Sequence, residues 1–171
     1  TGGPGTGKTT IINAIIKIIK QTGARILLAA PTGRAAKRMS EATWEKAVTL
    51  HRLLDYSIQQ GGFKKNDKTP LKADLIIIDE ASMIDTVLMH HFLKAVPSEC
   101  AVIMVGDINQ LPSVGPGNIL KDIIASQRFK VVTLDTIFRQ AQKSLIVVNA
   151  HKINQGKFPI ILNEKKKSNF Y

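Results

Sequence analysis

The stretch TGGPGTGKTT, Thr1 to Thr10, decides the fold of this chain. Residues 2–9, GGPGTGKT, match the pattern G-x-x-x-x-G-K-[ST] in full. Glycines let the backbone N–H groups of such a loop turn inward around phosphate oxygens, and the following helix adds its positive end. Lys8 would reach the β- and γ-phosphates and the Thr9 hydroxyl would bind Mg²⁺. The predicted nucleotide-binding residues are Gly2, Gly3, Pro4, Gly5, Thr6, Gly7, Lys8, Thr9 and Thr10.

Beyond this loop, apolar strands alternate with helical stretches. Isoleucines recur with helical spacing over residues 11–19, and Gly23 is placed to end that helix. TLHRLL (49–54) predicts a short helix, and the polar segment 57–70 predicts a surface loop or hairpin. Continuous apolar runs predict buried strands in RILLAA (25–30), LIIIDE (75–80), AVIMVGD (101–107) and KVVTLD (130–135). This alternation predicts an α/β fold, a mostly parallel sheet with helices on both faces.

Polar motifs follow the predicted strands directly. They are APTG (30–33), DEAS (79–82), GDINQ (106–110) and FRQ (138–140). Because the carboxyl ends of parallel strands form one edge of the sheet, we expect these motifs to gather there around a ligand.

The residues of these motifs suit phosphoryl-transfer chemistry. Asp79 would hold Mg²⁺ while Glu80 activates the attacking water, although a DE pair at a strand end is also a common start of a turn. Gln110 is placed to reach the γ-phosphate or the attacking water. Arg139 would stabilise the charge that develops on the transferred group, with a plain surface arginine as the alternative.

Composition limits the class of protein. The chain has 171 residues, enough for one well-cored domain, and no apolar run approaches the ~20 residues that span a membrane. Its net charge of +11 favours a polyanionic partner, with a solvated basic surface as the alternative. The single cysteine, Cys100, excludes an internal disulfide and predicts a small core residue.

Taken in order, these motifs resemble those of the RecD-like DNA helicases of superfamily 1B, the exodeoxyribonuclease V alpha-subunit family. DEASM together with GDxxQLPSVGPG is a far more specific combination than a P-loop alone. The resembling segments are TGGPGTGKTT (motif I), APTGRAAKRMSE (motif Ia), TLHRLL (the next DNA-contact motif), LIIIDEASMID (motif II), VGDINQLPSVGPGNIL (motif III) and LDTIFRQAQKSLIVVNAHKINQG (motif IV region).

The resemblance implies a RecA-like P-loop NTPase domain that uses ATP and Mg²⁺. It implies metal ligands in Thr9 and Asp79. It implies catalytic roles for Lys8, Glu80, Gln110 and Arg139. It also places single-stranded DNA along Pro31, Thr32, Gly33, Arg34 and His51.

The activity implied by the resemblance is ATP-driven 5′→3′ movement on single-stranded DNA, with duplex unwinding in recombination and repair, in the cytoplasm and with no membrane partner. Other recombination or repair subunits are expected partners. We expect residues 1–171 to form one RecA-like domain of a larger helicase whose motifs V and VI lie elsewhere, with a second motor domain beginning near residue 139. Three alternatives stay open: a Pif1-like or relaxase-linked helicase, a nucleotide-dependent DNA clamp that does not unwind, and an inactive P-loop scaffold.

Overall fold

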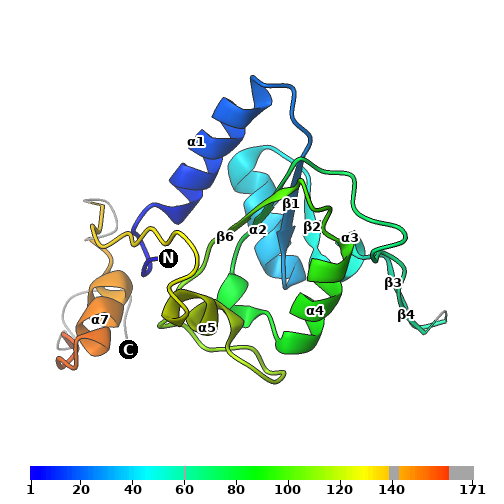
Figure 1. Cartoon of the computed structure of the whole chain (residues 1–171). Helices are drawn as coiled ribbons and strands as arrows, with labels where there is room; N and C mark the ends of the chain where they lie inside the picture. The colour runs from blue at the N-terminus through cyan, green and yellow to red at the C-terminus, as the bar shows by residue number, and fades with distance from the viewer. Residues whose placement is uncertain (60, 139–142, 162–171) are drawn as a thin grey trace.

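A four-stranded parallel sheet forms the centre of the molecule (Figure 1). The structure, a computed structural model, describes residues 1–59, 61–138 and 143–161. The strand order is β2 (Ala47–Thr49), β1 (Ile26–Ala30), β5 (Leu75–Ile78) and β6 (Ala101–Met104). Every neighbouring pair is parallel, so the expected α/β class is confirmed.

Helices cover both faces of this sheet. Helices α1 (Lys8–Lys20) and α2 (Gly33–Thr43) share one face, where Ile12 and Met39 pack with the strand residues Leu28 and Ile77. The opposite face carries α3 (Leu50–Leu53), the 3₁₀ turn η1 (Ala81–Met83), α4 (Thr86–Ala95) and α5 (Ile119–Ala125). The last described helix, α7 (Leu145–Asn154), lies beside the N-terminal residues rather than on the sheet (Figure 1).

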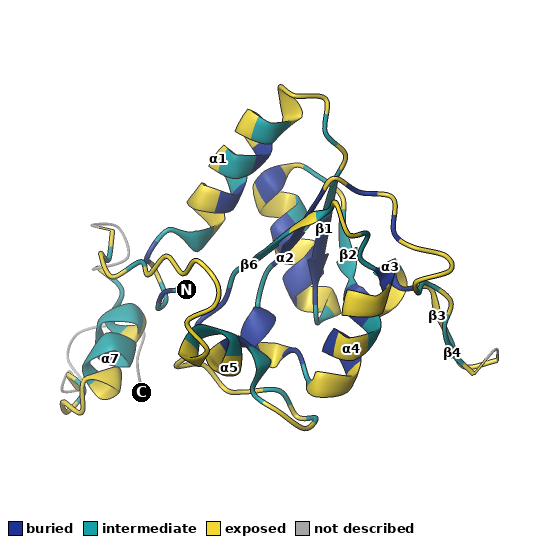
Figure 2. Cartoon of the chain, viewed as in Figure 1, coloured by how far each residue is buried: buried dark blue, intermediate teal, exposed yellow. Residues whose placement is uncertain are grey.

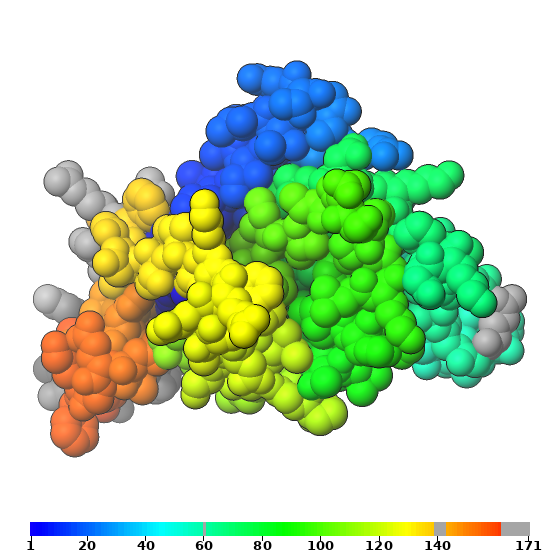
Figure 3. Space-filling view, in the orientation of Figure 1, coloured from blue at the N-terminus to red at the C-terminus, as the bar shows by residue number. Residues whose placement is uncertain are grey.

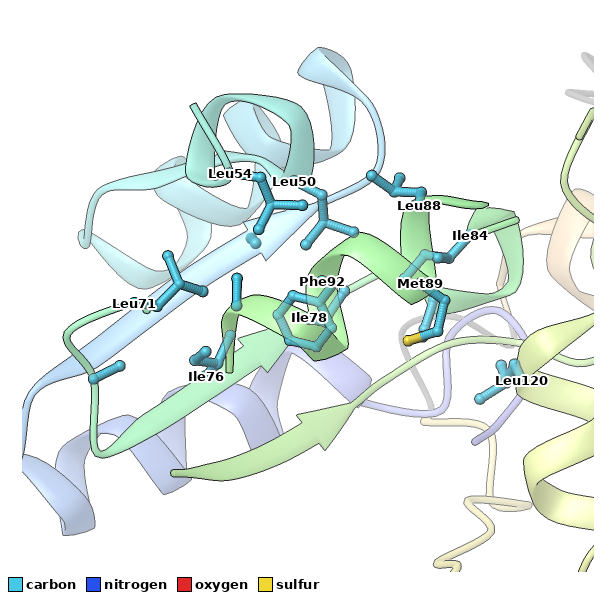
Figure 4. Close-up of a cluster of buried hydrophobic side chains, with 14 residues drawn as sticks. Leu50, Leu54, Leu71, Ile76, Ile78, Ile84, Leu88, Met89, Phe92 and Leu120 are labelled. Atoms are coloured by element: carbon cyan, nitrogen blue, oxygen red, sulfur yellow. The ribbon is translucent and has the colours of Figure 1, made fainter. Parts of the chain in front are cut away.

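Strand β5 feeds both cores because its side chains alternate between the faces. All four residues are buried, which matches the continuous apolar run in the sequence. Leu75 and Ile77 belong to the core under α1, and Ile76 and Ile78 to the core under α4. In that second core Ile76 and Ile78 lie around Phe92 of α4 (Figure 4). Figure 2 shows the resulting pattern, with buried residues on the inner sides of the helices.

Helix α1 begins directly after the P-loop and is amphipathic as expected. Ile12 and Ile16 are buried, and Ile15 and Ile19 pack against them. Ile11, also expected on this stripe, is 40% exposed because it lies at the border of the buried face. The helix ends at Lys20 with Gln21 as its C-cap, so Gly23, expected as the cap, lies two residues beyond it. Gly23 has φ 74° and donates its N–H to Lys20 O (3.1 Å) in the turn that follows the helix.

The strands of the structure differ from the predicted ones in two places. The segment 130–135 forms no extended ladder within the described residues; Leu134 makes one isolated parallel bridge, to Gly2. Next to this bridge, the terminal ammonium of Thr1 donates to Val132 O (2.7 Å) and Thr1 O accepts the Leu134 N–H (2.8 Å). Figure 3 shows residues of this segment, in yellow, over the end of the blue N-terminal region. Strand β2, conversely, was not predicted.

The segment predicted as a loop or hairpin contains an antiparallel hairpin. Strand β3 (Tyr56–Ser57) pairs with β4 (Gly62–Phe63), with Tyr56 opposite Phe63.

None of the described helices is long and apolar enough to cross a membrane.

Candidate active site

The P-loop wraps around the side chain of Lys8. Its Nζ donates to Gly2 O (2.7 Å) and Gly3 O (2.9 Å), while Thr6 Oγ1 donates to Gly3 O (2.8 Å). Gly7, the N-cap of α1, has φ 87°, a left-handed conformation that glycine adopts without strain. Glycine has no side chain to cap the first turn, so the N–H groups of that turn stay directed toward an anion.

The charge of Lys8 is influenced by three carboxylates. Burial lowers the pKa of Lys8, whereas the negative charges of Asp107, Asp79 and Glu80 raise it in opposition. Asp107 is 3% exposed and accepts the backbone N–H of Asn109 at 2.9 Å. The site thus combines one half-buried cation with three acidic groups.

Asp79 and Glu80 turn away from the end of β5. Asp79 donates its N–H to Ala29 O on β1 (3.0 Å) and accepts the N–H of Glu80 on Oδ1 (2.9 Å). Glu80 has φ 53°, a left-handed conformation that costs a non-glycine residue about 1–3 kcal/mol. The neighbouring Ala81 N–H donates to Val105 O (2.9 Å), which anchors the turn after β5 to the residue that follows β6.

One pocket of about 600 Å³ unites these groups. Its walls come from the P-loop, the ends of β5 and β6, and α2. Of the residues expected to act on nucleotide, it is lined by Pro4, Lys8, Thr9, Asp79, Glu80 and Gln110. Arg139 lies outside the described residues. Phe138 is described, and its N–H donates to Gly5 O (3.2 Å), so the segment that leads to Arg139 contacts the P-loop.

The donor set of the pocket fits Mg²⁺ with a nucleotide. Thr9 and Asp79 offer hard oxygen atoms at the pocket wall, and Mg²⁺ prefers few protein oxygens completed by phosphates and water. Among the described residues no three His, Cys, Asp or Glu side chains converge into a metal site of their own. An ion here would therefore need the phosphates to complete its ligands.

Three further groups at this site were not anticipated from the sequence. Asp107 lies three residues after β6, within the GDINQ motif that was expected at this edge, but no role was assigned to it. Arg38 Nη2 lies 2.5 Å from Glu80 Oε1, and His151 Nε2 donates to Pro4 O (3.0 Å). No sequence pattern links Arg38 or His151 to their partners, because each pair is formed by tertiary packing.

The residues expected to contact DNA lie along the same edge of the sheet. Pro31, Thr32, Gly33 and Arg34 follow β1, and Thr32 Oγ1 accepts the Ala35 N–H (3.2 Å) as the cap of α2. His51 is exposed on α3, directly after β2. Its ring lies against Tyr56 and Phe63 of the hairpin, at centroid distances of 5.6 and 5.7 Å.

The family model described as "AAA domain" matches residues 1–116. The chain belongs to this family. It is 42% identical over 159 residues to the ATP-dependent RecD2 DNA helicase of Deinococcus radiodurans, a match that covers 93% of this chain and 22% of that protein. It is 36% identical over 148 residues to the RecBCD enzyme subunit RecD of Mycolicibacterium smegmatis, covering 72% and 27%.

The fold is similar to that of a Bacteroides Pif1 crystallised with single-stranded DNA. The TM-score is 0.59 at 26% identity, over 92% of this chain and 42% of that one. The resemblance to RecD-like superfamily 1 helicases and the RecA-like P-loop fold are thereby confirmed. The chain spans about a quarter of the length of these RecD relatives.

Proposed function

We propose that this chain is the first motor domain of an ATP-dependent DNA helicase that moves 5′→3′ on single-stranded DNA and unwinds duplexes in recombination or repair. The observation that carries the proposal is a single sheet edge with two adjoining parts. The pocket with Lys8, Asp79 and Glu80 lies at the ends of β5 and β6, and APTGR and His51 follow β1 and β2.

In the proposed reaction the P-loop binds the phosphates of ATP. Lys8 exchanges its bonds to Gly2 O and Gly3 O for phosphate oxygens, where its charge stabilises the transferring group. Thr9 and Asp79 would hold Mg²⁺, which would supply further charge neutralisation. Glu80 orients the attacking water and accepts its proton, and Gln110 contacts the γ-phosphate or that water.

Arg139 is proposed to complete the charge stabilisation from the segment after Phe138. Residues 1–171 are proposed to act as one RecA-like domain, with a second motor domain beginning near residue 139 and closing over ATP. Single-stranded DNA along Pro31–Arg34 and His51 would be held through phosphate contacts, which position a strand without reading its sequence. The proposed setting is the cytoplasm, with recombination or repair subunits as partners.

RecD relatives at 42% and 36% identity favour the RecD-like reading over a Pif1-like one, for which the matched structure is 26% identical. A DNA clamp without unwinding is the second candidate. A nucleotide-dependent clamp would have the same pocket and the same DNA-contact residues. What favours a motor is that the RecD2 relative at 42% identity is named a DNA helicase.

Strand displacement by the whole protein tests the proposal. Duplexes with a 5′ or a 3′ single-stranded tail are incubated with ATP, using the Lys8→Ala variant as the inactive control. We expect displacement from the 5′-tailed duplex alone. Binding without displacement would instead support the clamp, and displacement from the 3′ tail would overturn the direction.

A further inference from the structure

Arg38 and Glu80 form an ion pair at the wall of the nucleotide pocket. The guanidinium Nη2 lies 2.5 Å from Glu80 Oε1. The Glu80 side chain is 23% exposed and that of Arg38 is 63% exposed, and both residues line the pocket. The carboxylate proposed to accept the proton of water is therefore already held by a cation of α2.

Helix α2 is also the helix whose first residues are the candidate DNA contacts. Arg34 lies in its first turn and Arg38 one turn later, so both side chains occupy the same face. Both are exposed, whereas Ala35 and Met39 are buried and hold the helix against the sheet. Helix α2 thus runs from the candidate DNA contacts at its first turn to Arg38, the partner of Glu80.

Only side chains need to move for this pair to open. The backbone of Glu80 is fixed by its N–H bond to Asp79 Oδ1 and by the strand contact of Ala81. The largely exposed guanidinium of Arg38 has solvent on its free side and can turn along the helix toward Arg34.

We propose that Arg38 is a positioning residue that restrains Glu80 until single-stranded DNA occupies the N-terminal end of α2. The inference rests on the function proposed above. A DNA phosphate beside Arg34 competes with Glu80 for the Arg38 guanidinium, because guanidinium binds phosphate and carboxylate with the same forked geometry. Once Arg38 moves to the phosphate, the Glu80 carboxylate is free to take the proton of the attacking water.

Rates of ATP hydrolysis by the whole protein, without DNA and with saturating oligo-dT, test this inference. We expect Arg38→Gln to raise the DNA-free rate about two- to fivefold, the range that the loss of a partly exposed ion pair allows. The DNA-saturated kcat should change by less than about twofold and the KM for ATP should stay constant, since DNA already releases Glu80 in the wild type. The stimulation ratio, which is the DNA-saturated rate divided by the DNA-free rate, should therefore fall about two- to fivefold in Arg38→Gln.

Two matched variants sharpen the test. Arg38→Lys keeps the charge but not the fork, so its stimulation ratio should lie between those of the wild type and Arg38→Gln. Lys37→Gln removes a neighbouring cation that pairs with Glu41 on the same helix, and should leave the ratio unchanged.

Three results would overturn the inference. An equal fall of both rates, or a raised KM for ATP, would place Arg38 on the nucleotide instead. If DNA stimulates the wild type and both Arg38 variants to the same degree, Arg38 does not restrain Glu80, but the proposed function still stands. A wild type whose hydrolysis does not respond to DNA would remove both.

Discussion

Lys8 is the residue on which the pocket depends. Its ammonium bonds to the two loop carbonyls and faces Asp107, Asp79 and Glu80. A triphosphate that enters the pocket therefore meets a cation already positioned within the loop.

Lys8→Ala should weaken ATP binding about 10- to 100-fold, the loss expected for charge-assisted hydrogen bonds to phosphate. Titration with a fluorescent ATP analogue measures this loss. Lys17→Ala, which removes an exposed cation from the last turn of the same helix, is the control. Equal affinity in the wild type and Lys8→Ala would rule out the P-loop as the nucleotide site.

The sequence predicts those single residues that belong to a local motif. Lys8, Thr9, Asp79, Glu80 and Gln110 were all expected, and all line one pocket. The partner of Glu80 was not predicted, because Arg38 lies 42 positions earlier and the packing of α2 alone brings it close.

Among the elements, α1 carries the P-loop onto the sheet through its apolar face. Ile16 is 4% exposed in the core beneath it, whereas Ile18 on the outer side is 63% exposed. The orientation of the loop thus depends on a few buried isoleucines.

Ile16→Ala should lower the free energy of unfolding by about 2–4 kcal/mol, because it leaves a cavity and loses buried apolar surface. Ile18→Ala should change it by less than about 0.5 kcal/mol. Urea unfolding compares the two. Similar losses for both variants would contradict the orientation of α1.

The amino ends of β1 and β5 are joined by Arg25 and Asp74. Asp74 Oδ2 accepts the Arg25 backbone N–H (2.7 Å) and Nε–H (3.2 Å), and Oδ1 accepts from Nη2 (3.1 Å). These bonds hold the pKa of Asp74 below its usual 3.8, the Arg25 side chain contributing most and its backbone N–H next.

A depressed carboxyl pKa stabilises the fold above pH 3.8, and this stabilisation disappears as the pH falls through the lowered pKa. Asp74→Asn should therefore unfold at lower urea concentration than the wild type at pH 7, with the difference vanishing in acid. Asp67→Asn, which removes an exposed carboxylate after β4, is the control for charge alone. A difference that persisted at low pH would show that the ion pair is not its source.

Elements with a strong local pattern were predicted well, and weak strands were not. Helix α1 and strands β1, β5 and β6 stand where the apolar runs lie. The three residues of β2 are half-buried and become a strand through pairing with Leu28–Ala30 of β1. Among the described residues, the backbone of the apolar run 130–135 makes one bridge to Gly2 and bonds to Thr1, which is too little pairing for a ladder. Strand formation here depends on the neighbour more than on the segment.

For the whole molecule, the net charge of +11 and the exposed residues Gly33, Arg34 and His51, which follow β1 and β2, suit a polyanionic strand. Two arginines, Arg34 and Arg38, stand on this side of α2. Affinity for oligo-dT should therefore fall linearly on a log–log plot against salt and depend little on base sequence.

Arg34→Ala should reduce the steepness of that salt dependence by about 0.7, the value for one phosphate contact on a single strand. Lys46→Ala should leave the slope unchanged, because Lys46 precedes β2 and so lies at the opposite edge of the sheet. Fluorescence anisotropy at several salt concentrations measures both slopes. Equal effects of the two variants would place the DNA elsewhere.

The central claim is that the pocket hydrolyses ATP with Glu80 as the base, in service of a strand held at the same edge. Steady-state ATP hydrolysis by the whole protein with single-stranded DNA, comparing the wild type with Glu80→Gln, tests it most directly. We predict that Glu80→Gln still binds ATP but turns over about 10²- to 10⁴-fold more slowly, the loss expected for a general base. Wild-type turnover by Glu80→Gln would contradict the account.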